Sequence, residues 1–368
     1  MQENRQAHEH TDFLLDKLDF SKRTFRHDKE TTPLLDGQVR LAIDKFALTA
    51  NNITYAVVGD QMQYWNFFPS HEDGFGRVPV WGFADVSESE CDGLNVGERV
   101  YGFLPISTDF IATPVAISAG GFIDGAEHRQ DLHPVYNQYT RVSGDPSYVP
   151  SLEAQQMILR PLFVTSFLIE DFLRDNDYFG ADRIILSSAS SKTAIGTAYQ
   201  IVQSETRPRE LVGLTSEGNR EFVGSLGLYD TVIAYDDIDS LVPTTASVVV
   251  DMAGNDDVLQ RLHAHLDDNL KYSCRVGKSH WDAGVISSKF AGPKPEWFFA
   301  PAQFKKRAGE LGTAQLMQKF SAASIGFVAS TNGWMEIVER HGEAAIEQTF
   351  DELLAGSVFP SQAFILSF

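Results

Sequence analysis

The amino-acid sequence predicts an α/β protein of two domains, one rich in β-strands and one built on a parallel sheet. The chain has 368 residues, which is enough for two domains of about 100–200 residues each. Its first third contains strands that are apolar on one side only, whereas the part from about residue 151 alternates short apolar strands with amphipathic segments. These observations separate a β-rich part of the chain from an α/β part.

Three strands are expected in the first third. Residues 39–48 (VRLAIDKFAL) largely alternate apolar with polar or charged side chains, which is typical of a half-buried strand. Residues 78–86 (VPVWGFADV) form a second expected strand, and residues 97–103 (GERVYGF) form a turn that leads into a third. Between the first two strands, residues 51–69 are crowded with polar and aromatic side chains and supply several of the candidate residues below.

From residue 152 to 174, apolar side chains recur at helical spacing, and a polar turn follows. Beyond it, short apolar strands alternate with helices. Strands are expected at residues 183–187, 211–215, 231–235, 247–251 and 271–276, with helices at 193–203, 219–226 and 257–266. Strands this short and this apolar, separated by helices, are typical of a parallel sheet covered on both faces. A helix at 342–356 and a strand at 363–368 end the chain.

The charge and the cysteine content argue against several classes of protein. The chain carries 50 Asp and Glu against 30 Lys and Arg, and its net charge of −20 repels phosphate backbones and anionic lipid, so we expect no nucleic-acid or membrane partner. Two cysteines, Cys91 and Cys274, are too few for a disulfide scaffold or a four-thiolate zinc site. The N-terminal segment is polar and lacks a signal-peptide core, so we expect a cytoplasmic protein.

The turn after the first strand of the parallel sheet is a candidate phosphate site, because ligands bind past the carboxyl ends of such strands. It reads SSASSKTAIG over residues 187–196. A turn of small residues lets the N–H groups and the dipole of a helix N-terminus meet a phosphate. The side chains expected there are Ser188, Ser190, Ser191, Lys192 and Thr193. Because the glycines of a GxGxxG loop are missing, a serine-rich loop that only packs the helix on the sheet is the alternative.

The end of the next strand predicts which dinucleotide binds. An acidic residue there would bind the ribose hydroxyls of NAD. The chain has Thr215 instead, and it is followed by Ser216, Asn219 and Arg220. These groups suit a 2′-phosphate, so NADP is expected. Two alternatives stay open, because Glu217 could bind a ribose and Arg220 could be a solvated helix charge.

Small residues follow the fourth strand of this sheet. Ala253 and Gly254 allow the close approach of a nicotinamide ribose. Asp251, just before them, could equally cap a helix.

In their order along the chain, several segments resemble the medium-chain dehydrogenase/reductase superfamily on its zinc-free, quinone-oxidoreductase-like side. They include VRLAIDKFALTANNITY, VPVWGFADV, LNVGERVYGF, RIILSSASSKTAIGTAYQI, LGLYDTVIAYDDI and AAIEQTFDELLAGSVFPSQAFILSF, and together they span nearly the whole chain. The resemblance implies a GroES-like β-rich catalytic domain of residues 1–155 and 320–368. It also implies a doubly wound Rossmann domain of residues 156–319 that binds the cofactor.

The chain departs from the zinc-dependent members of that superfamily, so no metal is expected. Neither cysteine lies in the substrate loop, and His8 and His10 fall in an expected flexible tail. The cofactor fingerprint departs as well. The loop can be aligned with the three glycines of the family's fingerprint in two ways. In one alignment other residues replace all three glycines, and in the other only Gly196 matches a glycine.

Without zinc, the reduction of a carbonyl or enone needs another group to meet the negative charge that develops on oxygen. By resemblance, residues 51–55 belong to the substrate loop. Tyr55 is the expected proton donor, and Asn52 is expected to position the substrate. Tyr64 and Tyr139 are further candidates. For each tyrosine, a half-buried side chain with a structural hydrogen bond is the alternative.

The leading interpretation is an NADPH-dependent, zinc-independent reductase of a small ketone, enone or quinone. The missing glycines keep a second class open, namely the same fold without redox activity, as a cofactor-independent lyase or a nucleotide-sensing binding protein. Relatives of this architecture are commonly dimers joined at the edge of the parallel sheet, so a homodimer is expected. Residues 271–277 and 323–329 (ASIGFVA) are the expected edge strands.

Overall fold

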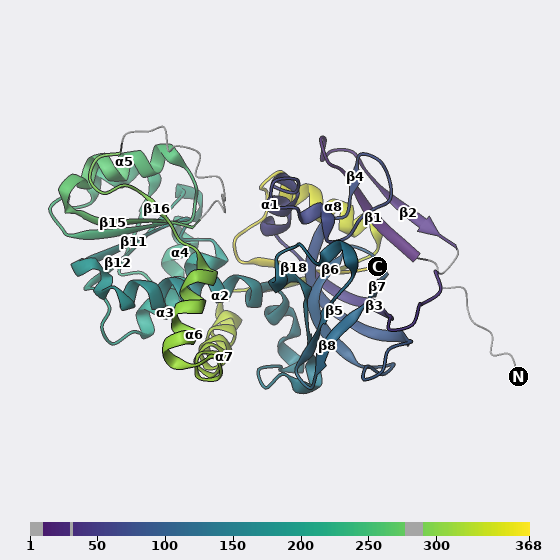
Figure 1. Cartoon of the computed structure of the whole chain (residues 1–368). Coiled ribbons are helices and arrows are strands. Elements are labelled where there is room, and N and C mark those ends of the chain that lie inside the picture. Colours follow the sequence, from purple (N-terminus) through teal and green to yellow (C-terminus); the bar gives the residue numbers. More distant parts are fainter. Residues whose placement is uncertain (1–9, 30–31, 277–289) are drawn as a thin grey trace, which may run out of the picture. The chain divides into compact units, whose positions relative to one another are not determined.

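The computed structural model describes residues 10–29, 32–276 and 290–368, and Figure 1 labels its helices and strands. Among these residues, no helix combines the length and the apolar character that a membrane span requires. The contacts between residues divide the chain into two compact units.

The first unit, which we call the β-rich unit, comprises Met1–Ile158 and Met335–Phe368. The second, which we call the parallel-sheet unit, comprises Leu159–Trp334. The chain returns to the β-rich unit after residue 334, whereas the sequence suggests residue 319. The difference arises because residues 323–329, which fit a strand by composition, continue a helix of the parallel-sheet unit.

A nine-stranded sheet frames the β-rich unit, and it is antiparallel except for the pair β17–β18. Its order is β17-β18-β3-β5-β6-β10-β9-β8, with β7 paired to β3. The strands are β3 Val39–Leu48, β5 Pro79–Ser89, β6 Arg99–Pro105, β7 Asp109–Ala112, β8 Pro114–Ser118, β9 Gly121–Asp124, β10 Gln138–Arg141, β17 Glu336–His341 and β18 Gln362–Ser367. The strands expected at 39–48, 78–86 and 97–103 are confirmed. Phe364 of β18 lies opposite Leu48 of β3, so the end of the chain completes this sheet.

The N-terminal residues form a hairpin that the sequence does not predict. β1 (His10–Asp16) pairs with β2 (Arg23–Asp28) and with β4 (Phe75–Gly76) in a separate three-stranded sheet. The apolar run of β1 is too short to signal a strand by periodicity, yet Phe13 is fully buried in the core of the unit. His10 therefore lies in a strand and not in a tail, while His8 lies outside the described residues.

Short helices complete the β-rich unit. They are α1 Ala50–Val57, η1 Tyr64–Asn66, η2 Glu127–Arg129, η3 Pro134–Asn137, η4 Val142–Gly144, η5 Pro150–Leu152 and α8 Glu343–Leu354. The helix expected at 342–356 is α8, and it buries Ile346 and Phe350 in the core of the unit. The two helices α1 and η1 account for much of the polar and aromatic stretch 51–69.

The parallel-sheet unit contains a six-stranded sheet of order β13-β12-β11-β14-β15-β16, and every pair in it is parallel. The strands are β11 Arg183–Ser187, β12 Glu210–Thr215, β13 Thr231–Ala234, β14 Ser247–Asp251, β15 Leu270–Arg275 and β16 Glu296–Trp297. The helices are α2 Glu153–Asp175, which begins in the β-rich unit, η6 Asp177–Gly180, α3 Lys192–Gln203, η7 Glu217–Asn219, α4 Arg220–Ser225, η8 Tyr235–Ser240, α5 Asp256–Leu266, η9 Asp267–Asn269, α6 Ala300–Leu311, α7 Thr313–Ser330 and η10 Thr331–Gly333. The predicted alternation of strands and helices is confirmed.

Alternate residues of each central strand point to two separate cores, because side chains alternate across a strand. Ile185 of β11 belongs to the core that contains Leu262 of α5. Its neighbour Ile184 belongs to the other core, with Leu173 of α2 and Ile201 of α3. Helices therefore cover both faces of the sheet, which confirms the doubly wound arrangement.

The expected edge strands differ from the structure. Residues 323–329 lie within α7, where only Phe327 and Val328 of this stretch are buried. An apolar run of this length fits a buried strand or a helix, and periodicity alone does not separate the two. β15 is not the edge either, because β16 pairs with its last two residues. Gly277 lies outside the described residues, and the homodimer stays a prediction.

Gly196 sets how closely α3 packs against α2. A Cβ at this position would lie 2.7 Å from Oγ and 3.1 Å from Cβ of Ser166. The Ser166 hydroxyl donates to the carbonyl of Thr193 (2.8 Å), so it cannot turn away without losing that bond. The glycine that survives in one alignment of the fingerprint is thus required for helix packing.

Replacing Gly196 with Ala should lower the free energy of unfolding by about 1–3 kcal/mol, the usual cost of overpacking a close contact. Gly224→Ala is the matched control, because Gly224 lies in α4 with nothing within 4 Å of an added Cβ. It should stabilise the protein by up to about 1 kcal/mol through helix propensity. Urea unfolding measures both, and an unchanged midpoint for Gly196→Ala would show that the two helices separate easily.

Candidate functional site

Loops that follow neighbouring strands of the parallel sheet meet at its carboxyl edge, where the ligands of such sheets bind. The Ser188 amide, after β11, donates a hydrogen bond to the hydroxyl of Tyr235, after β13 (3.1 Å). The side chain of Asn219, after β12, donates to the Ser190 hydroxyl (3.2 Å). The structure thus brings the expected phosphate loop and the expected ribose loop together.

Ser188 explains how the first of these loops turns without the glycine of a GxGxxG motif. Its φ of 51° lies in the left-handed region that glycine adopts without strain. A residue with a side chain costs about 1–2 kcal/mol there. The next helix begins at Lys192, and Ser191 caps it by accepting a hydrogen bond from the Ala194 amide (3.3 Å). The Ser191 hydroxyl is therefore already engaged by the helix.

Lys192 and the first turn of α3 give this edge a positive potential. The helix dipole places partial positive charge at its N-terminus, where Lys192 and Thr193 are the first residues. Burial lowers the pKa of the Lys192 ammonium to about 8, so most molecules still carry this charge at neutral pH. The arrangement suits a phosphate group.

Arg220, at the start of α4, lies between two carboxylates. Its Nη1 is 3.3 Å from Oδ2 of Asp237 and 3.4 Å from Oε2 of Glu217. Thr215 is buried at the end of β12, whereas Ser216 is exposed. Sequence reasoning identified Glu217 but missed Asp237, which follows the neighbouring strand β13. Asp237 could have been found from the sequence, because it is an acidic residue soon after a predicted parallel strand.

Asp251 organises the end of β14 and does not cap a helix. Its Oδ1 accepts hydrogen bonds from the Ser187 hydroxyl (2.8 Å) and from the amides of Ala253 (3.2 Å) and Gly254 (3.3 Å). Because Ser187 ends β11, this contact ties two neighbouring strands together at the carboxyl edge. The cap of α5 is Asn255. Ala253 and Gly254 are thereby held at the same edge as the other two loops.

In the β-rich unit, Tyr55 and Tyr64 belong to a group of aromatic side chains that we call the tyrosine cluster. Its members are Tyr55 of α1, Tyr64 of η1, Trp81 of β5, Phe103 of β6 and Tyr136 of η3. The ring centroids of Tyr55 and Tyr64 are 4.6 Å apart, and the hydroxyls of Tyr64 and Tyr136 are 2.9 Å apart. The Trp81 indole donates to the Tyr55 hydroxyl (3.4 Å). Tyr136 is a member that sequence reasoning did not select.

The tyrosine cluster offers hydroxyl donors without a charged side chain. Burial raises the pKa of Tyr55, Tyr64 and Tyr136, so all three stay protonated at neutral pH. Trp81 and Tyr136 remain partly exposed. The cluster can therefore present aromatic rings and O–H donors to an uncharged ligand.

Asn52 and Tyr139 are engaged within the fold. The Asn52 side chain accepts from the Thr49 amide (2.7 Å) and donates to the Pro79 carbonyl (2.8 Å). Tyr139 is buried, donates to a backbone carbonyl of β6 (2.6 Å) and accepts from Arg129 (3.1 Å). Because these polar groups already have partners, the function proposed below does not rely on either residue.

A cavity of about 640 Å³ in the β-rich unit has walls of mixed charge. Its titratable lining residues are Lys17, His71, Glu72, Asp73 and His128. Burial lowers the pKa of His128, whose Nε2 lies 3.2 Å from a backbone carbonyl. With a cation and two carboxylates on its walls, the cavity favours no single ligand charge.

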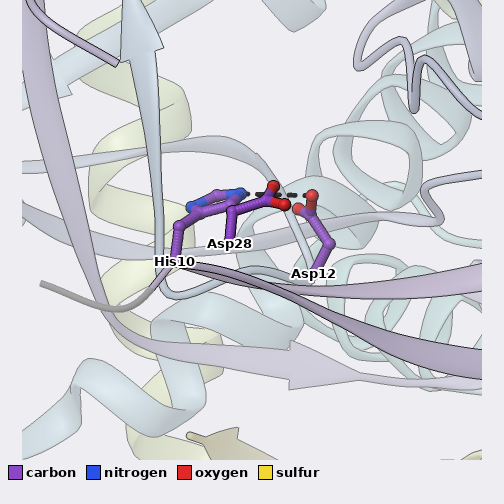
Figure 2. A group of neighbouring side chains, drawn as sticks. All are labelled: His10, Asp12 and Asp28. Carbon is purple, nitrogen blue, oxygen red and sulfur yellow. Dashed lines mark ion pairs between the residues drawn. The ribbon is translucent and has the colours of Figure 1, made fainter. Parts of the chain in front are cut away.

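His10, Asp12 and Asp28 lie close enough together to hold a metal ion, and Figure 2 shows the three side chains as neighbours. Their ligand atoms already have other partners. Asp12 is fully buried and accepts hydrogen bonds from Arg26 (2.6 Å) and Arg77 (2.5 Å). Because two guanidinium groups on one carboxylate repel a divalent cation, we interpret this group as an ion-pair cluster.

His10 bridges Asp12 of the ion-pair cluster and Asp109, which lies outside that cluster. Its Nε2 lies 3.1 Å from Asp12 and its Nδ1 lies 3.0 Å from Asp109. Burial by itself lowers the pKa of His10, but the hydrogen bonds to Asp109 and Asp12 outweigh it and raise the pKa to about 9. His10 is therefore charged at neutral pH and links β1 to β7.

Replacing His10 with Gln should lower the free energy of unfolding by about 1–3 kcal/mol at neutral pH. The folded protein holds the His10 proton more tightly than the unfolded chain does, and this difference stabilises the folded state. The stabilisation is complete below pH 6.5, the ordinary pKa of histidine, and is lost as the pH rises through about 9. Urea unfolding of both proteins from about pH 6 to about pH 10 measures the difference. A difference that stays constant with pH, or stabilisation of the wild type by added Zn²⁺, contradicts the ion-pair interpretation.

Solved structures with the same fold include reductases. The chain matches CurA in complex with NADPH from Vibrio vulnificus with a TM-score of 0.56 at 13% identity, over 93% of this chain and 94% of that one. It matches a mutant enoyl thioester reductase from Candida tropicalis with a TM-score of 0.57 at 12% identity, over 98% and 100% of the two chains. A quinone oxidoreductase from Coxiella burnetii matches with a TM-score of 0.50 at 14% identity, over 98% and 100%.

At these identities the likeness shows the fold alone. It confirms the expected fold class, a GroES-like β-rich domain with a doubly wound Rossmann domain, because the matches run over nearly the full length of both chains. No curated protein matches the chain. A family model described as "Protein of unknown function (DUF2855)" matches residues 46–359. The chain therefore belongs to the DUF2855 family.

Proposed function

We propose that the protein is an NADPH-dependent, zinc-independent reductase of a small ketone, enone or quinone. The observation that supports this best is the carboxyl edge of the parallel sheet, where the left-handed turn at Ser188, the N-terminus of α3 and Arg220 lie together. The similar structures add support, since one holds NADPH and the others are an enoyl thioester reductase and a quinone oxidoreductase.

The residues at this edge fit the parts of a dinucleotide. The N-terminus of α3 with Lys192 suits the pyrophosphate, and the guanidinium of Arg220 suits a 2′-phosphate. The pyrophosphate would contact Ser188, Ser190, Ser191, Lys192 and Thr193. The adenosine ribose and its phosphate would contact Thr215, Ser216, Asn219 and Arg220. The nicotinamide ribose would contact Ala253 and Gly254. When bound, the nicotinamide supplies the hydride.

Tyr55 is the proposed donor to the oxygen on which negative charge develops during reduction. Trp81 and Asn51 both donate hydrogen bonds to the Tyr55 oxygen. Because the Tyr55 oxygen accepts in these bonds, they do not use the Tyr55 proton, and they stabilise the charge that remains after its transfer to the substrate. Tyr64 is the second candidate, because its ring packs on Tyr55 and its hydroxyl lies beside that of Tyr136.

Replacing Tyr55 with Phe should lower kcat by about 10²–10³-fold, the range for the loss of one acid or oxyanion donor. The Kd for NADPH should not change, because the proposed nucleotide-binding residues belong to the parallel-sheet unit. Oxidation of NADPH by a quinone or enone measures kcat, and a fluorescence titration measures Kd.

Tyr148→Phe is the matched control for this variant. Tyr148 is a phenol of the β-rich unit outside the tyrosine cluster, and its hydroxyl donates to Glu153 (2.6 Å). We expect this control to keep its kcat. If Tyr55→Phe retains full activity, Tyr64 becomes the better candidate, and if a chelator abolishes activity, the zinc-independent mechanism is wrong.

Replacing Arg220 with Ala should weaken NADPH binding by about 1.5–3 kcal/mol, the scale of a charge-assisted hydrogen bond. NADH lacks the 2′-phosphate, so its affinity should stay nearly the same. Fluorescence titrations with both nucleotides measure this. Equal losses would mean that Arg220 supports the fold of its loop and does not bind the phosphate.

The same titrations separate the reductase from a redox-inactive protein of this fold. Nucleotide binding followed by NADPH oxidation with one of a panel of ketones, enones and quinones supports the reductase. Tight binding without oxidation across the panel favours a nucleotide-sensing protein. Absence of binding favours a cofactor-independent activity.

A further inference from the structure

Asp237 holds the arginine that is proposed to bind the 2′-phosphate. Nη1 of Arg220 lies 3.3 Å from Oδ2 of Asp237, and the two side chains are 45% and 49% exposed. We propose that the Asp237 carboxylate weakens the binding of NADPH relative to NADH and so reduces the preference of the site for NADPH. The inference rests on the proposed function, since it concerns the nucleotide of that reductase.

The pairing of strands brings these two residues together. β12 and β13 are neighbours in the sheet, with Thr215 opposite Ala234 at their carboxyl ends. Arg220 begins the helix that follows β12 and η7, and Asp237 lies in η8, which follows β13 directly. Both side chains are thus placed at the edge where the nucleotide is proposed to bind.

Contacts other than the Asp237 carboxylate hold η8 in place. The Ser240 hydroxyl donates to the backbone carbonyl of Asp237 (2.6 Å). The hydroxyl of Tyr235, the first residue of η8, accepts from the Ser188 amide (3.1 Å). Removing the charge of Asp237 should therefore leave the loop unchanged and alter only the electrostatics around Arg220.

The carboxylate acts against a 2′-phosphate in two ways. It neutralises part of the charge on Arg220, and it repels the phosphate, which carries about −1.5 to −2 at neutral pH. Because the pair is half exposed, the two effects together are modest, about three- to tenfold in affinity. NADH presents a ribose hydroxyl at this position, and a carboxylate can accept a hydrogen bond from it. The two nucleotides therefore respond differently to the same side chain.

Fluorescence titrations of NADPH and NADH into the full chain and its Asp237→Asn variant test the inference. The variant should bind NADPH about three- to tenfold more tightly and should keep its Kd for NADH within about twofold. Asp236→Asn is the matched control, because Asp236 is an exposed neighbour on η8 that forms no ion pair with Arg220 in the described part of the chain. It should leave both affinities within about twofold.

Several results would overturn the inference. These are an unchanged NADPH affinity in Asp237→Asn, an equal gain for both nucleotides, or the same gain in Asp236→Asn, and each leaves the reductase proposal standing. Failure of the wild type to bind either nucleotide overturns the proposed function and this inference together. Glu217→Gln serves as a second variant, with a smaller gain expected because Glu217 is 71% exposed and lies 3.4 Å from Arg220.

Discussion

A buried ion pair between Arg129 and Asp124 organises the β-rich unit. Nη1 of Arg129 lies 3.2 Å from Oδ2 of Asp124, and both side chains are only 1% exposed. Arg129 also donates to the Phe67 carbonyl (3.2 Å) and to the Tyr139 hydroxyl (3.1 Å). Removing one partner of such a pair leaves an uncompensated buried charge, at a cost of about 3–5 kcal/mol. The guanidinium anchors the segment that carries Tyr64, so the geometry of the tyrosine cluster depends on this pair.

The loop after β11 separates the roles that glycines combine in a dinucleotide fingerprint. The left-handed conformation of the turn is adopted by Ser188, with φ 51°. The close packing of the following helix still requires a glycine, Gly196, because an added Cβ would lie 2.7 Å from Ser166. Ser187 and Asp251 then join the ends of β11 and β14 by a hydrogen bond of 2.8 Å. The left-handed turn, the close helix packing and the joined strand ends thus persist at this edge of the sheet although most of the glycines are absent.

The sequence by itself determined the elements whose signal is local. Alternation over residues 39–48 and the short segment 183–187 (RIILS), with its apolar centre, predicted strands with the bounds that the structure shows. The pattern of apolar residues predicts such strands because it shows which faces of the strand are buried. Part of the candidate site followed from the same logic, since Ser188 and Arg220 were selected by their position after predicted strands. Tyr55 was selected as a phenol in the loop that the family resemblance assigns to the substrate, and Tyr64 as a phenol beyond that loop. The structure places their rings together.

The tertiary structure decided every contact between segments that are distant in sequence. Residues 323–329 fit a strand or a helix, and only the fold assigns them to α7. Asn52 is held by Pro79 across 27 positions of the chain, so its side chain has a structural partner that no local pattern reveals. Tyr136 meets Tyr64, and Asp237 meets Arg220, because sheet pairing and turns bring them together. The sequence gives the polarity of each side chain. The partner of that side chain depends on which strands and loops become neighbours in the fold.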